Sequence, residues 1–195
     1  MKKVIICLSI ILIFVGCKPR VDPVLKKGYT LYSKGKYKEA LTVYDQFIIK
    51  NKDNVNGYLL RAELYLKINQ LDKSMKDYIK ILTLDKKNVY AFHQIGIIYH
   101  NKKNYKKAIE YFEQNIAHDP HSFLGYYNMA CAYSLLKNKE KSLWAYEHAV
   151  NIYNTMDVNR KQVMNHNMYK YSLADDDLKF IRNDKRFRVL LHMIQ

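Results

Sequence analysis

Cysteine, glycine and tryptophan are scarce in this chain of 195 residues, which contains three, six and one of them. The glycines after residue 16 fall at helix contacts, turns or helix starts, so none is left to build a phosphate-binding loop. A Ser/His/Asp arrangement, a nucleophile elbow and a pair of catalytic carboxylates are also missing. We therefore expect no enzyme activity, no cofactor and no small-molecule substrate. A catalytic site of unrecognised type is the alternative.

The longest apolar run, residues 4–15, is about half of the roughly 20 residues that a membrane-spanning helix needs. Lys2-Lys3 precede this run and the small residue Gly16 follows it. A positive start, a short apolar core and a small residue before the cut are typical of a secretory signal. We therefore expect an export signal over residues 1–16 rather than a permanent membrane span.

The end of the run, Phe14-Val15-Gly16-Cys17, resembles the bacterial lipobox, with Phe14 in place of the usual Leu. The resemblance implies that Cys17 is lipidated and becomes the acylated N-terminus, and that residues 17–20 form a short linker. More than one acyl chain anchors a protein stably, at ~0.8 kcal/mol per buried methylene. The implied address is the bacterial cell envelope, on its periplasmic or surface side. The alternative is a secreted protein in which Cys17 is incidental.

The three cysteines cannot form a disulfide within the mature chain. Cys7 leaves with the signal and Cys17 becomes a thioether, so Cys131 stands alone. The fold must then depend on packing. Because Ala130 and Ala132 flank Cys131 on a predicted helix, we expect a small buried residue rather than a reactive thiol.

Residues 89–122 carry a spaced set of small and aromatic residues. Gly96 and Ala108 lack bulk where two antiparallel helices would cross, aromatic rings fill the space around them, and Pro120 ends the second helix. The set resembles the tetratricopeptide repeat, a helix-turn-helix of 34 residues. The residues that carry this resemblance are Phe92, Ile95-Gly96, Tyr99, Ala108, Phe112 and Pro120.

The same pattern recurs at steps of 34 residues along the chain. Positions one or two steps from Ala108 are small (Ala40, Ser74 and Ser142), and those from Phe112 are aromatic (Tyr44, Tyr78 and Tyr146). Arg61 stands where the family prefers Leu. We predict an all-α fold, an α-solenoid of about four repeats at 21–54, 55–88, 89–122 and 123–156. Residues 157–195 are then expected to form C-terminal capping helices.

The expected cap contains three helical segments. We predict a helix over Asp157–Tyr171, with Met164, Met168 and Tyr171 on one side. Three aspartates at 175–177 suit a helix start, where negative charge opposes the dipole, and a loose cation site is the alternative. A last stripe comprises Phe187, Leu190, Leu191 and Ile194. The string Asp177-Leu178 to Phe187 also resembles the "D-L … L-R-x-D-x-R-F" ending that follows many bacterial tetratricopeptide arrays.

In this family the first helices of the repeats line a concave groove that receives an extended peptide or a partner helix. The resemblance transfers this role by register to a largely aromatic and apolar set, and such rings are good contact anchors. The alternative is that these residues pack against neighbouring helices, or against the C-terminal tail folded into the groove. The predicted groove residues are Tyr29, Tyr32, Leu59, Glu63, Tyr90, His93, Ile97, His100 and Tyr127.

Two more specific sites are not expected. A subset of the family grips a C-terminal carboxylate with Lys and Asn, but Leu25, Tyr29 and Leu60 occupy the corresponding positions here. His93 and His100 lie two helical turns apart, and neither they nor the other histidines match the spacing of a closed metal site. We therefore predict an apolar or aromatic peptide as the ligand, and no metal.

The formal charge of +15 admits an anionic partner, such as an acidic envelope polymer or lipid headgroups. The lysines, however, recur in every repeat, and we do not expect them to gather into one stripe. The favoured function is a membrane-anchored scaffold that binds a segment of a partner protein in the groove, in envelope assembly by analogy with similar lipoproteins. The alternative is a basic surface that binds acidic polymers or lipid, and no nucleic-acid partner is expected.

Overall fold

The structure, a computed structural model, describes residues 22–157 and 168–194. These residues form α-helices and one 3-10 helix, which confirms the predicted all-α fold of paired helices with extra C-terminal helices. The predicted signal, Cys17 and residues 158–167 lie outside the described ranges. The chain divides into two compact units, an N-terminal unit that ends at Pro120 and a C-terminal unit that begins at His121.

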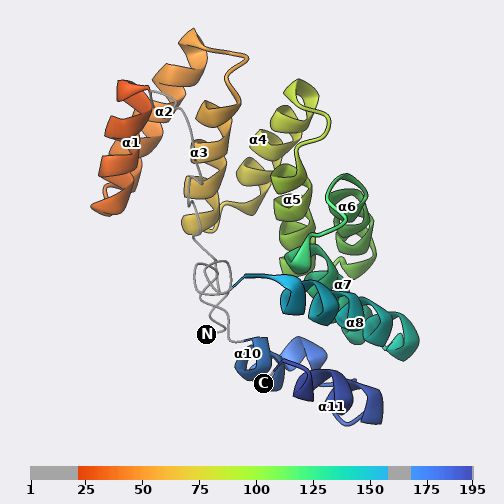
Figure 1. Cartoon of the computed structure of the whole chain (residues 1–195). Helices are drawn as coiled ribbons and strands as arrows, with labels where there is room; N and C mark the ends of the chain where they lie inside the picture. The colour runs from red at the N-terminus through yellow and green to blue at the C-terminus, as the bar shows by residue number, and fades with distance from the viewer. Residues whose placement is uncertain (1–21, 158–167, 195) are drawn as a thin grey trace. The chain divides into compact units, whose positions relative to one another are not determined.

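The N-terminal unit consists of three antiparallel helix pairs, coloured red to green in Figure 1. In each pair a first helix, the A helix, packs on a second, the B helix, and the next A helix packs on that B helix. One pair lies in each of the first three predicted repeats. The pairs are α1 (Pro23–Ser33) with α2 (Tyr37–Lys50), α3 (Val55–Lys67) with α4 (Leu71–Leu84), and α5 (Val89–Asn101) with α6 (Tyr105–His118).

The turn between A and B helices uses the left-handed backbone region in every repeat. Gly35 has a φ of 75°, and the equivalent residues Asn69, Lys103 and Lys137 have φ values of 58°, 59° and 60°. Glycine and asparagine adopt this region readily, whereas a lysine there costs roughly 1–2 kcal/mol. The chain therefore keeps the same turn even where its sequence does not favour it.

The helices of a pair cross closely at the predicted small residues. A Cβ atom added to Gly96 would lie 2.4 Å from Cε1 of Phe112, and one added to Gly28 would lie 2.3 Å from Cε1 of Tyr44. These distances are too short for any real side chain, so both crossings require glycine.

The small residue in the first turn of each B helix is buried at the crossing as well. The Ser74 hydroxyl donates to the carbonyl oxygen of Ala62 at 2.9 Å, and the Ser142 hydroxyl donates to that of Ala130 at 2.8 Å. Each serine thus ties its B helix to its A helix by a buried hydrogen bond. The equivalent residues of the other two repeats are the fully buried Ala40 and Ala108.

A lysine lies over a tyrosine ring at the same position of three repeats. The ammonium group approaches the ring face, where the π-electrons attract a cation. The lysine stems thereby cover aromatic surface, so part of the lysine content serves the fold. The pairs, with distances from Nζ to ring centroid, are Lys73 and Tyr65 (5.5 Å), Lys107 and Tyr99 (5.4 Å), and Lys141 and Tyr133 (5.5 Å).

Arg61, which replaces the usual Leu, joins three helices through two carboxylates. Its Nε and Nη2 donate to Asp77 at 2.8 and 2.7 Å, and its Nη1 donates to Asp45 at 2.6 Å. These hydrogen bonds raise the pKa of Arg61, and burial raises the pKa of Asp77 although Arg61 opposes that shift. The guanidinium also lies over the rings of Tyr58 and Tyr65. At this position an ion network therefore holds the helices together, whereas most repeats use an apolar contact.

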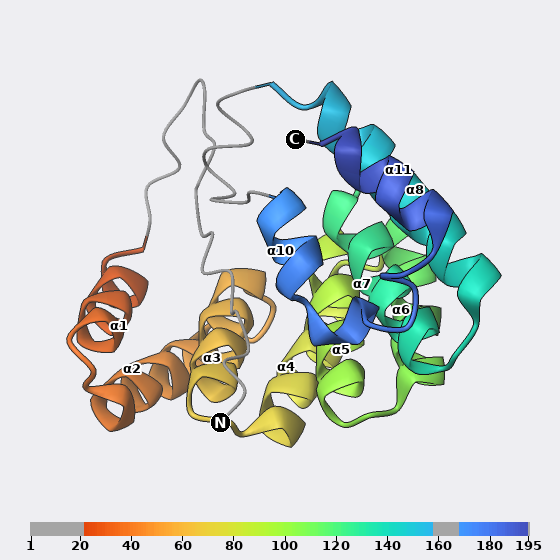
Figure 2. The same cartoon turned by 90° about the horizontal axis from the view of Figure 1, so that it is seen from below.

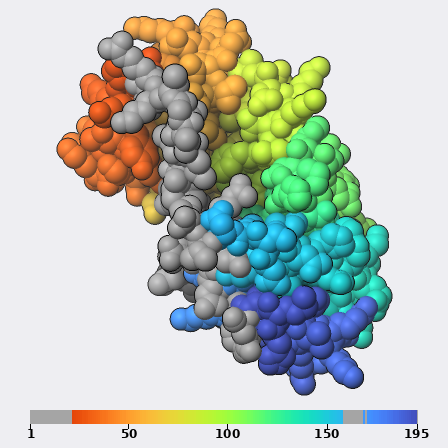
Figure 3. Space-filling model, in the orientation of Figure 1, coloured from red at the N-terminus to blue at the C-terminus, as the bar shows by residue number. Residues whose placement is uncertain are grey.

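The C-terminal unit contains a fourth helix pair and the tail that covers it. α11 packs along α8, and the cyan and dark blue atoms of these helices touch in Figure 3. The 3-10 helix η1 packs on α7, and Figure 2 shows the tail helices beside the pair. The elements are α7 (Phe123–Leu135), α8 (Lys139–Thr155), α10 (Met168–Ala174), η1 (Asp176–Leu178) and α11 (Lys185–His192).

The string Asp177-Leu178 to Phe187 and the residues after it attach the tail to the fourth helix pair. The Phe187 ring lies 4.6 Å from the Tyr146 ring, centroid to centroid, and both residues are fully buried. Arg186 donates to both carboxylate oxygens of Glu140, at 2.8 and 2.9 Å. The predicted apolar stripe is buried, as are the two apolar residues that precede it: Leu178, Ile181, Phe187, Leu190, Leu191 and Ile194.

The first predicted segment of the tail, Asp157–Tyr171, falls mostly outside the described residues. α8 ends at Thr155 and Asp157 is not helical, because the chain turns to an extended backbone at Met156. Met168 and Tyr171 do lie in a helix, α10, while Met164 falls outside the described residues.

The three aspartates stand at a helix start, as predicted. Asp175 precedes η1, and its side chain accepts a hydrogen bond from the Asp177 backbone N–H at 3.0 Å. This is the bond of a helix cap, which satisfies a backbone donor that has no partner inside the helix.

No helix within residues 22–157 and 168–194 is both long enough and apolar enough to cross a membrane.

Candidate partner-binding face

The predicted groove residues of the N-terminal unit come from its three A helices. α1 supplies two tyrosines, α3 a leucine and a glutamate, and α5 a tyrosine and an isoleucine. α1 contacts α3, and a hydrogen bond joins α3 to α5. We call this set the A-helix face: Tyr29, Tyr32, Leu59, Glu63, Tyr90 and Ile97.

Glu63 is the centre of the A-helix face. Its Oε1 accepts one hydrogen bond from the Tyr78 hydroxyl and another from the Tyr90 hydroxyl, both at 2.5 Å. The residue is only 7% exposed, and the two bonds join α3 to α4 and to α5. A single carboxylate oxygen therefore fixes two aromatic side chains.

The tyrosines around Glu63 are held in their neutral form. Burial and the Glu63 charge raise the pKa of both Tyr78 and Tyr90, and each hydrogen bond to Glu63 adds to the shift. On the other side, burial and the same charge raise the pKa of Tyr32. Tyr32 of α1 therefore lies within the electrostatic influence of Glu63, whereas the hydrogen bonds of Glu63 join α3 to α4 and α5.

Large aromatic surfaces on this face reach solvent. Tyr29 is 47% exposed and Tyr90 is 36% exposed. Tyr29 and Tyr32 stack with their ring centroids 6.1 Å apart, and Tyr32 lies 5.8 Å from Tyr37. Rings that pack on one side and meet water on the other are suited to contact a partner.

His93 and His100, also predicted in the groove, lie against B-helix rings. The His93 ring is 5.9 Å from Phe112, and burial lowers the pKa of His93 to about 4. The His100 ring is 5.4 Å from Tyr105. No group of three potential ligands in the described part of the chain could hold a metal ion. The two histidines are not brought together.

In the C-terminal unit the equivalent face is covered by the chain itself. The Tyr127 hydroxyl donates to Oδ2 of Asp175 at 2.9 Å, and the Cys131 thiol lies 3.7 Å from the same oxygen. Arg182 donates to the carbonyl oxygen of Asp175 at 2.6 Å and holds the segment in place. Tyr127, predicted to contact a partner, therefore contacts the tail, which is the alternative that the sequence left open.

Cys131 is a buried, unreactive thiol. It is 3% exposed, and burial together with the Asp175 carboxylate raises its pKa. A thiol reacts as the thiolate, so this environment suppresses its reactivity. The expected structural role of this cysteine agrees with its surroundings.

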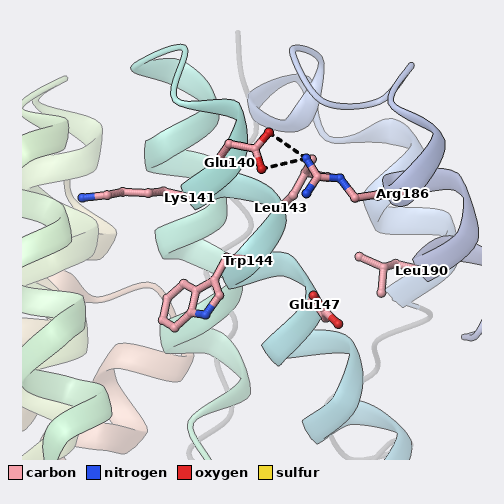
Figure 4. Close-up of a pocket in the computed structure, with 7 residues that line it drawn as sticks. All are labelled: Glu140, Lys141, Leu143, Trp144, Glu147, Arg186 and Leu190. Carbon is pink, nitrogen blue, oxygen red and sulfur yellow. Dashed lines mark hydrogen bonds and ion pairs between the residues drawn. The ribbon is translucent and has the colours of Figure 1, made fainter.

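A hollow of about 400 Å³ lies between α8 and α11. Glu140 and Arg186 pair with each other at its rim, while Lys141 and Trp144 point away from Arg186 (Figure 4). The side chains do not converge on one point, so the hollow lacks the arrangement of a ligand site. Its full lining is Glu140, Lys141, Leu143, Trp144, Glu147, Arg186 and Leu190.

The repeat pattern and the helix pairs agree with one family. Models of the tetratricopeptide repeat match residues 28–47, 55–88, 89–122 and 125–155, which together make up more than half of the chain. The chain is a tetratricopeptide repeat protein. Proteins of this family are protein–protein interaction modules and are generally non-enzymatic scaffolds.

Two relatives illustrate how this tetratricopeptide repeat protein compares in sequence. Hsp70-Hsp90 organizing protein 3 of Arabidopsis thaliana is 33% identical over 95 residues, covering 49% of this chain and 17% of that protein. TPR repeat-containing protein YpiA of Bacillus subtilis is 26% identical over 125 residues, covering 64% of this chain and 29% of that protein. The matched region thus spans less than a third of either relative.

Solved structures show the same fold. The crystal structure of MamA superposes with a TM-score of 0.64 at 20% identity, covering 85% of this chain and 93% of that chain. The TPR domain of Arabidopsis OM64 gives a TM-score of 0.52 at 24% identity, covering 56% and 90%. At these identities the likeness concerns the fold alone.

Sequence reasoning missed two members of these sites. Tyr78 stands at a position predicted only for packing, yet its hydroxyl binds Glu63. Asp175 is predicted as part of a helix start, and it also accepts a hydrogen bond from the Tyr127 hydroxyl. A buried tyrosine hydroxyl needs an acceptor, so the requirement was visible in the sequence, but the identity of the acceptor was not.

Proposed function

We propose that this protein is a scaffold that binds an extended segment of a partner protein on the A-helix face of its N-terminal unit. The observation that carries the proposal is the exposure of two rings on this face: Tyr90, whose hydroxyl binds the Glu63 carboxylate, and Tyr29, which stacks on Tyr32. Aromatic anchors around a fixed polar group are the usual composition of a binding hot spot. The chain itself has no catalytic role in this proposal.

The face suits an apolar or aromatic segment rather than a terminal carboxylate. Leu25 is buried, Leu60 is partly buried, and Tyr29 stands where a clamp would need a polar group. The charged group at the centre is Glu63, which repels an incoming carboxylate. Similarity to Hsp70-Hsp90 organizing proteins supports a protein partner, but these differences argue against recognition of a chaperone tail.

We also propose that the protein is exported and anchored to the cell envelope by lipid on Cys17, where it takes part in envelope assembly. The support is the sequence pattern at residues 1–17. A tether at the membrane raises the local concentration of both partners, so weak contacts suffice. Cys17→Ala is expected to abolish incorporation of labelled fatty acid, whereas Cys131→Ala is expected to leave it unchanged. A Cys17→Ala chain that still takes up label contradicts the anchor.

Photo-crosslinking in living cells tests the binding face. A photoreactive residue replaces Tyr29 on the A-helix face or, as a control, the exposed Lys76 on α4. A discrete adduct with another protein from position 29 but not from position 76 supports the proposal. Equal adducts from both positions, or none from position 29, contradict it.

A second candidate function is supported by the distribution of charge. We define the A–B edge as residues 33–39, 67–73 and 101–107, the turn ends of the three helix pairs. It carries nine exposed lysines and two carboxylates, whereas the rest of residues 22–120 carries nine basic and nine acidic residues. The expectation that lysines do not gather is therefore wrong for this unit. The edge lysines are Lys34, Lys36, Lys38, Lys67, Lys73, Lys102, Lys103, Lys106 and Lys107.

Interaction with the helix dipole does not explain the basic edge, although Lys73 and Lys107 also pack over tyrosine rings. Lys38, Lys73, Lys106 and Lys107 lie in the first turns of B helices, where the helix dipole disfavours positive charge. We propose that the edge binds an acidic envelope polymer or anionic lipid headgroups.

Anionic vesicles and poly-glutamate serve as probes of the edge. Charge reversal at Lys34, Lys103 and Lys106 is expected to abolish binding to one of them, and added salt is expected to weaken it steeply. Reversal at Lys50, Lys76 and Lys86, away from the edge, is the matched control. Equal losses in the two triple variants contradict a role for the edge.

A further inference from the structure

Glu63 is a buried carboxylate with no cationic partner in the described part of the chain. Asp77, the other acidic residue in the core of the N-terminal unit, receives two hydrogen bonds from the Arg61 guanidinium. Glu63 receives only the hydroxyls of Tyr78 and Tyr90, and no salt bridge to it exists among the described residues. An ionised group without a counter-charge in a buried place is costly to a fold.

The hydrogen bonds from Tyr78 and Tyr90 do not require a negative charge on Glu63. Both hydroxyls donate to the same atom, Oε1 of Glu63, and the carbonyl oxygen of a glutamine would accept them equally well. The structure gives Oε2 no donor from the described residues. The negative charge and the second oxygen therefore have no use in the fold of this unit.

We propose that the A-helix face receives a lysine or arginine side chain of the partner segment, with its cationic group at Oε2 of Glu63. The inference deepens the proposed function and rests on it. Tyr90, which binds Glu63, and the stacked Tyr29 and Tyr32 give the same face aromatic surface that favours a cation, because ring faces attract positive charge. The neutral, hydrogen-bonded tyrosines hold the carboxylate in position before the partner arrives, which limits the ordering cost of binding.

The basic A–B edge does not prevent a cation from reaching this place. Exposed charges are screened over about 8 Å at physiological salt, whereas a partly buried pair is screened much less. Apolar neighbours on the same face, Leu59 and Ile97, would contact the partner residues on either side of the cation. The preferred segment therefore has a basic residue between apolar ones.

Three blocked pentapeptides test the site on the full chain in detergent at physiological salt. Each has the sequence Ala-Leu-X-Leu-Ala with acetyl and amide ends, and X is lysine, norleucine or glutamate. Lysine and norleucine share an apolar stem and differ in the charged end. The lysine peptide is expected to bind about 10-fold more tightly than the norleucine peptide, the range of a hydrogen bond to a charged group, and the glutamate peptide is expected to bind most weakly.

The isosteric variant Glu63→Gln assigns this preference to one residue. It is expected to bind the lysine and norleucine peptides equally, with the affinity for norleucine unchanged. Glu113→Gln, an exposed glutamate on α6, is the matched control and is expected to keep the preference. The comparison of peptides on the unmodified chain needs no variant, so it stands even if Glu63→Gln fails to fold.

Equal affinity for the lysine and norleucine peptides overturns the cation site and leaves the proposed function standing. A preference that persists in a folded Glu63→Gln chain also overturns it. No binding of the lysine peptide overturns the cation site whatever else is observed. The adduct at position 29 then decides the proposed function separately.

Discussion

The A-helix face of the N-terminal unit and the equivalent face of α7 use one repeat geometry in opposite ways. Tyr29 and Cys131 stand at the same position of their repeats, and Tyr29 is 47% exposed whereas Cys131 is 3% exposed. On α7 the tail supplies Asp175, which Tyr127 and Cys131 contact. On the N-terminal unit the central carboxylate, Glu63, belongs to the face itself.

Among residues 22–157 and 168–194, the tail covers the face of α7, whereas no segment covers the exposed rings of the A-helix face. The tail fills the last repeat with its own side chains and closes the end of the array. The face of α1, α3 and α5 keeps exposed rings and a carboxylate with no counter-charge among the described residues, which cost stability. Such a cost is typical of a surface kept for binding.

Asp175→Ala is expected to have the largest effect on the difference between the two faces. It removes a residue by which the tail contacts α7. Tyr127 loses its acceptor and η1 loses its cap, so we expect a loss of about 2–4 kcal/mol in the free energy of unfolding. Cys131 should also react faster with a maleimide, measured at that residue by mass spectrometry. The exposed neighbour variant Asp176→Ala should change neither quantity. An unchanged reaction rate at Cys131 in Asp175→Ala would show that the tail does not shield α7.

Gly96→Ala tests the close helix crossing that builds the N-terminal unit. The added methyl group meets the Phe112 ring, so we expect overpacking to lower the free energy of unfolding by about 1–3 kcal/mol in denaturant titrations. Asn101→Ala at the exposed end of the same helix is the control. A midpoint that does not move would mean that the crossing is looser than the structure shows.

His93 should make the N-terminal unit sensitive to acid. Its pKa is about 4 in the folded chain and near 6.5 when exposed, so the folded state binds fewer protons. Its stabilising contribution is complete above pH 6.5 and is lost as the pH falls toward 4. We expect a loss of about 1–2 kcal/mol over this range relative to His93→Gln, from urea titrations at each pH. Parallel pH profiles of the two chains would contradict the burial of this ring.

Ser74→Ala and Ser142→Ala compare the two units at an equivalent contact. Each removes one buried hydroxyl-to-carbonyl bond, and two other repeats accept alanine there, so we expect about 0.5–1 kcal/mol in each case. Thermal melts of both variants measure the effect. A much larger loss in only one of them would show that the two crossings are not equivalent.

The sequence predicted the fold well because its signals are local and repeated. Steric fit restricts how three features can pack, and the structure packs each of them as predicted. They are the glycines at 28 and 96, the small residue of each B helix and the ending around Phe187. The end of α8 at Thr155 agrees with the predicted end of the fourth repeat at residue 156.

The site was less predictable because it depends on pairs far apart in the sequence. The register placed Glu63 and Tyr90 on one face, but not the hydroxyl of Tyr78 on the same oxygen. The substitution at Arg61 was visible, whereas its two carboxylate partners on different helices were not. Tyr127 could not be assigned to the tail by register, since the 34-residue period ends at residue 156.

Alkylation of cysteines at equivalent positions tests the central claim most directly. In a Tyr29→Cys chain, the reaction rates of the introduced thiol and of Cys131 are measured together by mass spectrometry after a brief pulse of maleimide. An open face in the N-terminal unit and a covered one on α7 predict rapid modification at position 29 and slow modification at Cys131. Equal rates, or a faster reaction at Cys131, would contradict the account.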